Sequence, residues 1–406
     1  MFSVFRLGLL FISLSLALFA EEKEPFVAGQ NQFSWNLLQQ IGDIKGNVCI
    51  SPYNISSAMQ LVYFGAASTT KSQIGQALHL PKMSDTALAE NIVNFETKIA
   101  EDVANAKAVA VDTTYTVAPA FLDIVKGTLK ADLFTCDFQN KPEQAVASIN
   151  KWVSSKTEEH IQQLLERDNI KSTTRLVLLS AIYLKADWLF PFDEKSTKES
   201  PFRALNGSDI TVPMMYQKET MLYHQDSQAQ VVWRDFEKHE NSPTQLQAMI
   251  VLPSINVALD TFVKGIDSAK VGQWEKESSR ELVALYLPKC SLKQRQSVKN
   301  SLISLGMTQA FSNAANLSVI SPKLDITIDD VLHEAFMQLD EKGVIAAGAT
   351  GVIIGLKSVM EPPKKEFVMR CDRPYLVVIR EKESGLVLFV SVVASPEKIE
   401  KKNLRT

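Results

Sequence analysis

The residues best suited to chemistry are few and scattered along the chain. Histidine occurs only at positions 79, 160, 224, 239 and 333, and none of these spacings is typical of a metal site. His333 and Glu334 begin a zinc-protease pattern, but Met337 stands where the second histidine is required. No Gly-x-Ser-x-Gly nucleophile motif is present. These failures predict that the protein is not an enzyme and holds no metal.

One stretch comes near a phosphate-binding loop. Residues 351–358 read GVIIGLKS, but Leu356 separates Gly355 from Lys357, so the pattern that cradles a phosphate is broken. No other segment suggests a bound group, and we expect no cofactor.

The most unusual segment of the chain is residues 340–363, DEKGVIAAGATGVIIGLKSVMEPP. Between Gly343 and Leu356 it has no charge, proline or aromatic residue, and its glycines disfavour a helix and weaken a permanent strand. In an extended chain, alternate residues share one face. One such set is neutral throughout: Val344, Ala346, Gly348, Thr350, Val352, Ile354 and Leu356. The segment is therefore predicted to be an exposed loop in one state and a sheet strand in another.

This segment resembles the hinge of inhibitory serpins. The resemblance begins with Glu341-Lys342-Gly343 and continues through the small residues that follow. It implies a hinge made of Glu341, Lys342, Gly343, Val344, Ile345, Ala346, Ala347, Gly348, Ala349 and Thr350. Further matches occur in family order over nearly the whole chain: residues 47–52, 150–153, 181–192, 212–215, 287–289, 317–318, 362–363 and 372–375.

The resemblance also implies a bait bond. In serpins the bait residue lies sixteen positions after the hinge glutamate, which from Glu341 gives Lys357, with Ser358 on the leaving side. A lysine there suits a trypsin-like serine protease, whose specificity pocket holds a carboxylate. The alternative is a non-inhibitory serpin, acting as a carrier, storage or chaperone protein, in which Lys357 is a solvated loop residue. The small, uncharged hinge argues against this alternative.

The mechanism implied by the resemblance is a covalent trap. The protease cleaves the bait bond and forms an acyl-enzyme, and the freed loop then inserts into the main sheet and distorts the protease before deacylation. Two hinge positions depart from the family pattern. Val344 replaces the usual threonine or serine, and Ile345 replaces the usual glutamate. Ile345 would be exposed after insertion, so we expect slower or weaker inhibition.

Two supporting sites follow from the same resemblance. The first is a polar cluster beneath the point where the sheet opens: Ser51, Asn54, Ser180 and His333. Serpins usually carry serine where Asn54 stands and asparagine where Ser180 stands, so these two side chains look exchanged. The second site is where the loop first inserts: Trp188, Lys289 and Glu341, with an expected Lys289–Glu341 ion pair.

The spacing of apolar residues predicts the helices and strands that position these residues. Residues 31–41 and 85–103 show helical periodicity, and Pro142 opens another helix, whose buried stripe is expected at Val146, Ile149 and Val153. Residues 176–184 and 248–252 are apolar strands, and residues 375–379 and 386–393 flank a hairpin turn. Mixed elements without strict alternation predict an α+β class. The resemblance adds a serpin fold, with a large central β-sheet, two further sheets, about nine helices and an exposed loop near the C-terminus.

The organisation of the chain is simple. Residues 1–20 resemble a signal peptide, with Arg6 before an apolar stretch at 7–19 and cleavage after Ala17 or Ala20; an uncleaved anchor is the other interpretation. We expect a single domain over residues 21–397 and a basic tail over 398–406. The protein would then be secreted, either extracellular or, in a bacterium, periplasmic.

The net charge limits the classes of partner that the protein can bind, and the cysteine content bears on disulfide pairing. The net charge of −3 gives no basic field for nucleic acid, and no later segment is apolar enough for a membrane. The expected partner is a trypsin-like serine protease, bound covalently by a monomer. The four cysteines, Cys49, Cys136, Cys290 and Cys371, are few and far apart, so we expect them to be unpaired.

Overall fold

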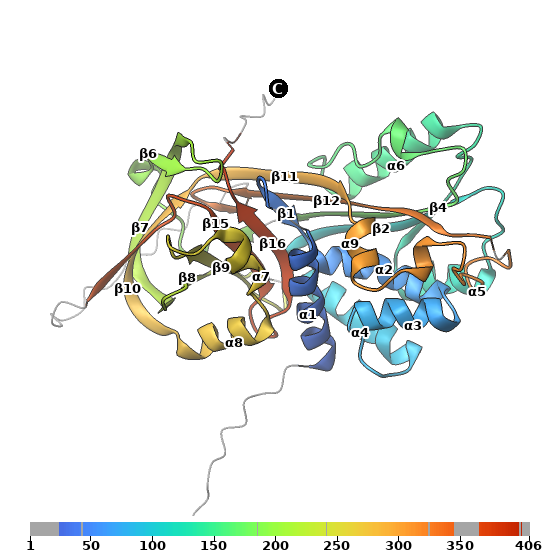
Figure 1. The fold of residues 1–406 in the computed structure, drawn as a ribbon, viewed down its shortest axis with the longest axis horizontal. Helices are drawn as coiled ribbons and strands as arrows, with labels where there is room; N and C mark the ends of the chain where they lie inside the picture. The colour runs from blue at the N-terminus through green and yellow to red at the C-terminus, as the bar shows by residue number, and fades with distance from the viewer. Residues whose placement is uncertain are drawn as a thin grey trace, which may run out of the picture.

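The computed structural model describes residues 24–41, 44–184, 186–240, 242–323, 325–344, 365–397 and 399. Within these residues the chain forms nine α-helices and three β-sheets (Figure 1). The helices are α1 (Pro25–Gln40), α2 (Pro52–Gly65), α3 (Ser68–Ala77), α4 (Asp85–Ile99), α5 (Pro119–Leu122), α6 (Pro142–Lys156), α7 (Leu259–Lys264), α8 (Ser268–Glu277) and α9 (Lys299–Ser304). None of the helices in the described ranges is long and apolar enough to cross a membrane.

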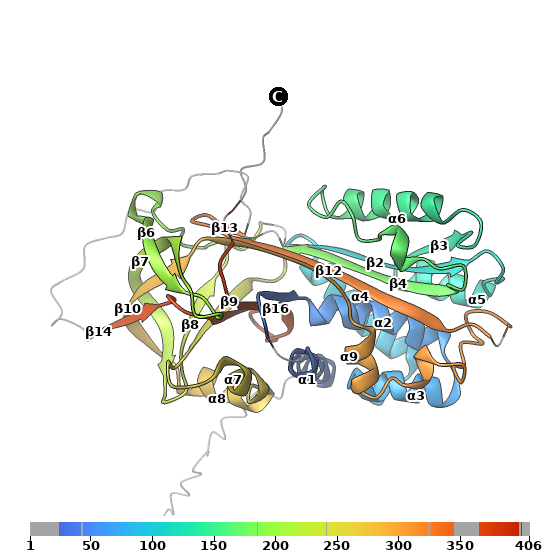
Figure 2. The same ribbon diagram turned by 45° about the horizontal axis from the view of Figure 1, so that its top comes forward.

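A five-stranded sheet runs along the molecule. Its strand order is β11 (Cys290–Ser297), β12 (Ile328–Leu339), β4 (Leu176–Leu184), β2 (Val103–Asp112) and β3 (Asp132–Cys136). Figure 2 shows α6 on one face of this sheet and α2 on the other. Every residue of β4 is buried, as expected for a strand covered on both faces.

The largest sheet has nine strands. In order they are β1 (Val48–Ile50), β16 (Val387–Val393), β15 (Tyr375–Glu381), β9 (Leu246–Pro253), β8 (Ala229–Asp235), β7 (Asp209–Gln225), β10 (Ser279–Pro288) and β14 (Glu366–Arg370), with β6 (Lys198–Arg203) also paired to β7. A two-stranded sheet joins β13 (Gly343–Val344) to β5 (Ala186–Asp187). The strand that leads into the hinge, β12, belongs to the five-stranded sheet.

Most predicted elements are confirmed, with three corrections. The helix predicted over residues 85–103 ends at Ile99, because Val103 begins β2 after a short turn; both side chains are buried, so apolar spacing alone did not separate them. The first helix starts earlier than predicted, at Pro25. In α6, Ile149 and Val153 are buried as predicted, but Val146 is only half-buried and Ala145 takes its place in the buried stripe. The α+β class and the number of helices agree with expectation.

Candidate functional site

The chain reverses direction directly after β12. The backbone N–H of Asp340 donates to the carbonyl of Gly343 at 3.0 Å, and Asp340 Oδ1 accepts from the N–H groups of Lys342 (2.9 Å) and Gly343 (3.2 Å). Gly343 has φ +155°, and a Cβ there would lie 2.3 Å from the carbonyl oxygen of Ala186. Only glycine therefore lets β13 approach β5 this closely.

Glu341 anchors this turn through its side chain. Lys289 Nζ lies 2.5 Å from Glu341 Oε2, and Thr197 Oγ1 donates to Oε1 at 2.8 Å. Burial alone would raise the pKa of Glu341, but the hydrogen bonds from Lys289 and Thr197 outweigh it, and the pKa is lowered. The backbone takes part too, since the N–H of Phe192 donates to the Glu341 carbonyl at 2.8 Å. The structure thus contains the ion pair that the resemblance implied.

Trp188 holds the same turn from the other side. Its indole Nε1 donates to the carbonyl of Asp340 at 3.0 Å, and its backbone N–H donates to the carbonyl of Lys342 at 2.7 Å. The ring stacks on Phe236, with centroids 4.4 Å apart, and the guanidinium of Arg234 lies 4.9 Å from the Trp188 ring. Trp188, Lys289 and Glu341 therefore lie together around one turn.

The four residues of the predicted polar cluster are all inaccessible to solvent and joined by hydrogen bonds. The Ser51 backbone N–H donates to His333 Nε2 at 3.0 Å, and the other ring nitrogen, Nδ1, lies 3.0 Å from Ser180 Oγ. Burial lowers the pKa of His333 to about 3, so the ring is neutral. Because Nε2 accepts, Nδ1 carries the proton and donates to Ser180.

The same chain of hydrogen bonds continues beyond Ser180. The Ser180 hydroxyl donates to Asn54 Oδ1, and Asn54 Nδ2 donates to Asn105 Oδ1 at 2.5 Å. Ser51 Oγ donates to the carbonyl of Leu388 at 2.6 Å and accepts from the backbone N–H of Asn54 at 3.1 Å. The exchange of serine and asparagine between positions 54 and 180 therefore leaves each of these polar groups with a partner.

The cluster spans two adjacent strands of the five-stranded sheet. Ser180 lies in β4 and His333 in β12, and the parallel register places them directly opposite each other. Their hydrogen bond therefore joins the two strands from below. Separating β4 from β12 at this point requires the bond to break.

The remaining predicted residues lie outside the described residues. These are the bait bond Lys357–Ser358 and the distal hinge, Ile345, Ala346, Ala347, Gly348, Ala349 and Thr350, and for Val344 only the backbone is described. The predicted signal peptide also lies outside the described residues, as does all of the basic tail except residue 399.

Sequence reasoning missed two residues of these sites. Thr197, which bonds Glu341, has no local signal, because its role depends on a tertiary approach. Asn105 did have a local sequence signal. In β2, Asn105 and Lys107 alternate with alanines, as expected of two polar side chains on one face of a strand. Asn105 is half-buried, whereas Lys107 is buried and bonds Ser57 and Glu96.

All four cysteines are buried and unpaired, which confirms the prediction. Burial raises the pKa of Cys49 and Cys290 to about 12 and that of Cys136 to about 11. The Cys371 pKa is raised by burial as well.

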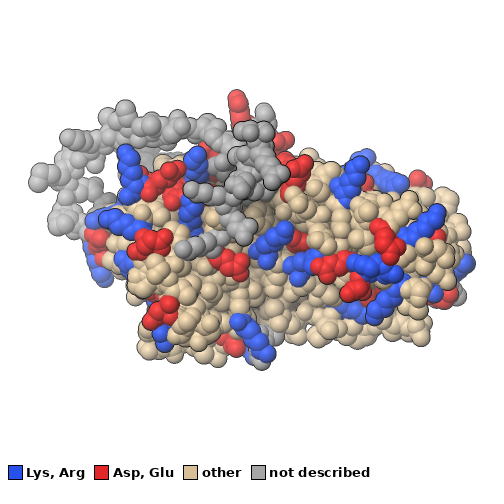
Figure 3. All heavy atoms as spheres, turned by 90° about the horizontal axis from the view of Figure 1, so that it is seen from above, with Lys and Arg blue, Asp and Glu red and all other residues tan. Residues whose placement is uncertain are grey.

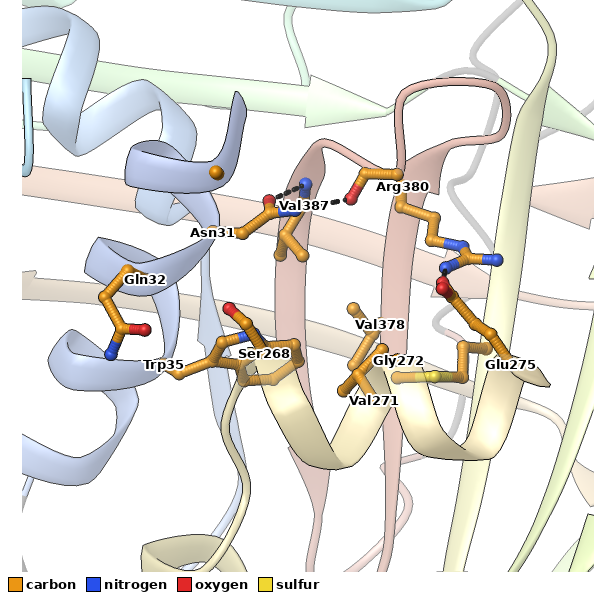
Figure 4. A pocket seen from close by; sticks show the side chains of 13 residues that line it. Asn31, Gln32, Trp35, Ser268, Val271, Gly272, Glu275, Val378, Arg380 and Val387 are labelled. Carbon is orange, nitrogen blue, oxygen red and sulfur yellow. Dashed lines mark hydrogen bonds and ion pairs between the residues drawn. The ribbon is translucent and has the colours of Figure 1, made fainter. Parts of the chain in front are cut away.

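A separate cavity of about 290 Å³ lies between α1, α8 and the nine-stranded sheet (Figure 4). Trp35 and Val271 supply apolar wall, and Arg380 lies at one end. The Arg380 guanidinium contacts Glu275 and also bonds Gln247 Oε1, through Nη2 at 2.6 Å. The one cation lining this cavity is therefore already paired.

Comparison with known proteins matches the chain to one family over nearly its whole length. The serpin family, described as serine protease inhibitors, matches residues 28–396. A serpin-like protein of Methanosarcina acetivorans is 32% identical over 93% of this chain and 87% of its own, and a leukocyte elastase inhibitor of Sus scrofa is 30% identical over 92% and 100%.

Solved structures agree with this match. The native state of the thermophilic serpin tengpin superposes with a TM-score of 0.82 at 26% identity, covering 92% of this chain and 95% of tengpin. A thyroxine-binding globulin in complex with thyroxine gives a TM-score of 0.79 at 23% identity, covering 92% of this chain and all of its own, and shares the fold.

Proposed function

Because this chain belongs to the serpin family of protease inhibitors, we propose that it inhibits trypsin-like serine proteases and presents Lys357–Ser358 as the bait bond. A lysine at the bait position fits a protease pocket that ends in a carboxylate. The protease supplies the chemistry, and this chain supplies the bait and the conformational change that follows cleavage.

The observation that carries the proposal is the parallel pairing of β4 with β12. After β12 the chain turns back, and β13 runs antiparallel to β5, the continuation of β4. A strand formed by the residues after Val344 would therefore run antiparallel to both β4 and β12. Inserted between them, it would replace one parallel pairing with two antiparallel pairings, which are slightly more stable per residue.

The lengths of the two segments support such an insertion. β12 has 12 residues, which at about 3.3 Å each span roughly 40 Å. The stretch from Val344 to Lys357 is two residues longer, so once extended it would run the whole length of β12. After insertion, the bait end would lie at the end of the sheet opposite the hinge, where Ile328 lies beside Leu176. A protease still attached to Lys357 would be carried with it.

The proposal is tested by incubation with a panel of trypsin-like proteases followed by denaturing electrophoresis. We expect a covalent complex and a released fragment that runs from Ser358 to Thr406. The curated relative from Sus scrofa is named an elastase inhibitor. A fragment that begins after an aliphatic residue would therefore move the bait bond and assign the protein to an elastase-like target. Cleavage without any complex would contradict inhibition.

We also propose that the protein is exported and acts as a monomer. Arg6 and the apolar stretch at residues 7–19 support export. Expression of the whole chain in a secreting host should give a mature protein that begins at Leu18 or Glu21. A product that retains Met1 would contradict export. Light scattering should give the mass of one chain.

The second candidate function is that of a non-inhibitory carrier, and the cavity between α1 and α8 is the observation that favours it. Its volume of about 290 Å³ is near the lower limit for small-molecule sites. Since Arg380 is already paired with Glu275, an anionic ligand would have to displace an existing interaction. A carrier should bind a neutral apolar ligand that quenches Trp35 fluorescence and should be cleaved by proteases without trapping them.

A further inference from the structure

A second hollow lies on the outer surface of the nine-stranded sheet. It adjoins the hinge turn, because its lining residues Ser196 and Lys198 flank Thr197, which bonds Glu341. Its volume is about 440 Å³, and it is formed by β6, β7, β10, β14 and the short helix Glu194–Ser196. Three cations line it: Lys195, Lys198 and Arg370. On the face of the molecule drawn in Figure 3, basic and acidic side chains are intermixed.

Strand register explains why these cations meet. Lys198 of β6 lies opposite Met214 of β7, and Arg370 of β14 lies opposite Tyr286 of β10. β7 and β10 are neighbours, so the two basic residues lie on strands three positions apart. At about 4.8 Å per strand, β6 and β14 are roughly 14 Å apart. The long side chains of the two basic residues close the hollow from opposite sides.

The floor between the cations is aromatic. Tyr216 and Tyr286 lie opposite each other in the register, with ring centroids 4.8 Å apart. The guanidinium carbon of Arg370 lies 3.6 Å from the centre of the Tyr286 ring. This stacking fixes the plane of the guanidinium and leaves its N–H edge available for a planar or tetrahedral oxyanion.

The cations lack acidic partners in the part of the chain that the structure describes. No carboxylate there forms an ion pair with Lys195, Lys198 or Arg370. Basic residues close to them in the sheet are paired, Arg203 of β6 with Asp209 and Lys218 of β7 with Glu366. The paired residues show that this sheet can neutralise its charges. Three unpaired cations around one hollow form a site for negative charge.

We propose that this hollow binds a polyvalent oxyanion, a molecule with two or more phosphate or sulfate groups, held by Lys195, Lys198 and Arg370 over the Tyr216–Tyr286 floor. The span between the cations selects a ligand with separated charges over a single inorganic ion. The bound ligand would connect β6 to β14, which is the last strand of its sheet and pairs only with β10 among the described strands.

The test is isothermal titration of the intact protein with two probes, inorganic tripolyphosphate and sucrose octasulfate, with uncharged sucrose as a blank. Binding of one probe and not the other identifies the ester type. We expect Lys198→Gln and Arg370→Gln each to weaken binding about tenfold, because each removes a hydrogen bond to a charged group. Arg370→Lys should recover binding only in part, since it keeps the charge and loses the stacked fork.

The matched control is Arg203→Gln, which removes one positive charge from β6 but lies outside the hollow. It should bind as the wild type does. Hydrogen exchange gives a second measurement: amides of β14 should exchange more slowly with the probe bound. Thermal unfolding checks that each variant folds. If Lys198→Gln or Arg370→Gln does not fold, Lys195→Gln replaces it in the binding test, because Lys195 is exposed and lies outside the sheet. No binding up to about 1 mM, or equal affinity in Arg370→Gln and Arg203→Gln, would overturn the proposal.

Discussion

Ser180 and His333 face each other across two parallel strands, and a 3.0 Å hydrogen bond joins Ser180 Oγ to His333 Nδ1 beneath the five-stranded sheet. The His333 ring also accepts from the backbone of Ser51 at the start of α2. One neutral imidazole therefore connects β4, β12 and a helix. Any strand that enters between β4 and β12 has to replace this bond.

The first prediction concerns pH. The pKa of His333 is about 3 in the folded state, below the value of about 6.5 in an unfolded chain. Its contribution to stability is therefore complete above pH 6.5 and is lost as the pH falls toward 3, by about 1.4 kcal/mol per unit. Urea unfolding between pH 6.5 and 4.5 should show this slope.

The control for that slope is His333→Gln, which should remove most of it. His79 also has a pKa lowered by burial, so His79→Gln is the matched variant and should leave most of the slope in place. Equal slopes in the wild type and in His333→Gln would show that the buried imidazole does not govern acid stability.

The second prediction concerns the anchor of the hinge. Lys289→Met leaves the Glu341 carboxylate with Thr197 as its side-chain partner, so we expect a loss of about 1–2 kcal/mol at pH 7. The pKa of Glu341 is lowered in the fold, so this contribution is present above about pH 4.5 and is lost below it.

A double-mutant cycle with Glu341→Gln measures the coupling directly. The two single variants should together cost more than the double variant. Strict additivity would mean that the ion pair contributes nothing beyond its two separate residues.

The third prediction concerns Gly343. Gly343→Ala places a Cβ 2.3 Å from the Ala186 carbonyl oxygen, so β13 has to move away from β5. We expect faster hydrogen exchange at Trp188, whose N–H bonds Lys342, and a loss of about 1–3 kcal/mol. Gly127→Ala is the control, because nothing lies within 4 Å of its Cβ position. Exchange at Trp188 that is unchanged in Gly343→Ala would contradict the close approach.

The fourth prediction tests insertion itself. Ala346→Arg puts an arginine on the alternating face that is expected to turn inward when the loop becomes a strand, and burying it without a partner costs several kcal/mol. Cleavage at Lys357 should proceed while trapping fails, so the stoichiometry of inhibition should rise several-fold. After loop cleavage, the variant should also gain much less heat resistance than the wild type.

The neighbouring Ala347→Arg is the matched control, because residue 347 faces the other side of an inserted strand. It should trap protease with nearly the wild-type stoichiometry. If Ala346→Arg traps as well as Ala347→Arg, insertion at this hinge is not the mechanism.

Apolar spacing along the sequence predicted the bounds of some secondary-structure elements and missed those of others. β4 was predicted with its observed bounds, because residues 176–184 are apolar except for Ser180, a pattern typical of a strand covered on both faces. The end of α4 was missed, because Ile99 and Val103 are both buried and keep helical spacing across a turn.

Some residues of the candidate sites were predicted from the sequence, and others became apparent only in the fold. The family resemblance predicted the ion pair between Lys289 and Glu341, whereas the hydrogen bond from Thr197 to Glu341 is known only from the tertiary fold. The hollow at Arg370 could not be predicted from the sequence, because it depends on how β6 and β7 pair with β10 and β14, which are distant from them in the chain.

The four buried thiols have a consequence for where the protein can work. None of the four is a thiolate at neutral pH, since burial raises the pKa of each thiol well above 7. None forms a disulfide that cross-links the fold. Disulfide exchange requires a thiolate that can reach its partner. The folded chain is therefore expected to keep the same covalent structure at its cysteines in an oxidising and in a reducing compartment.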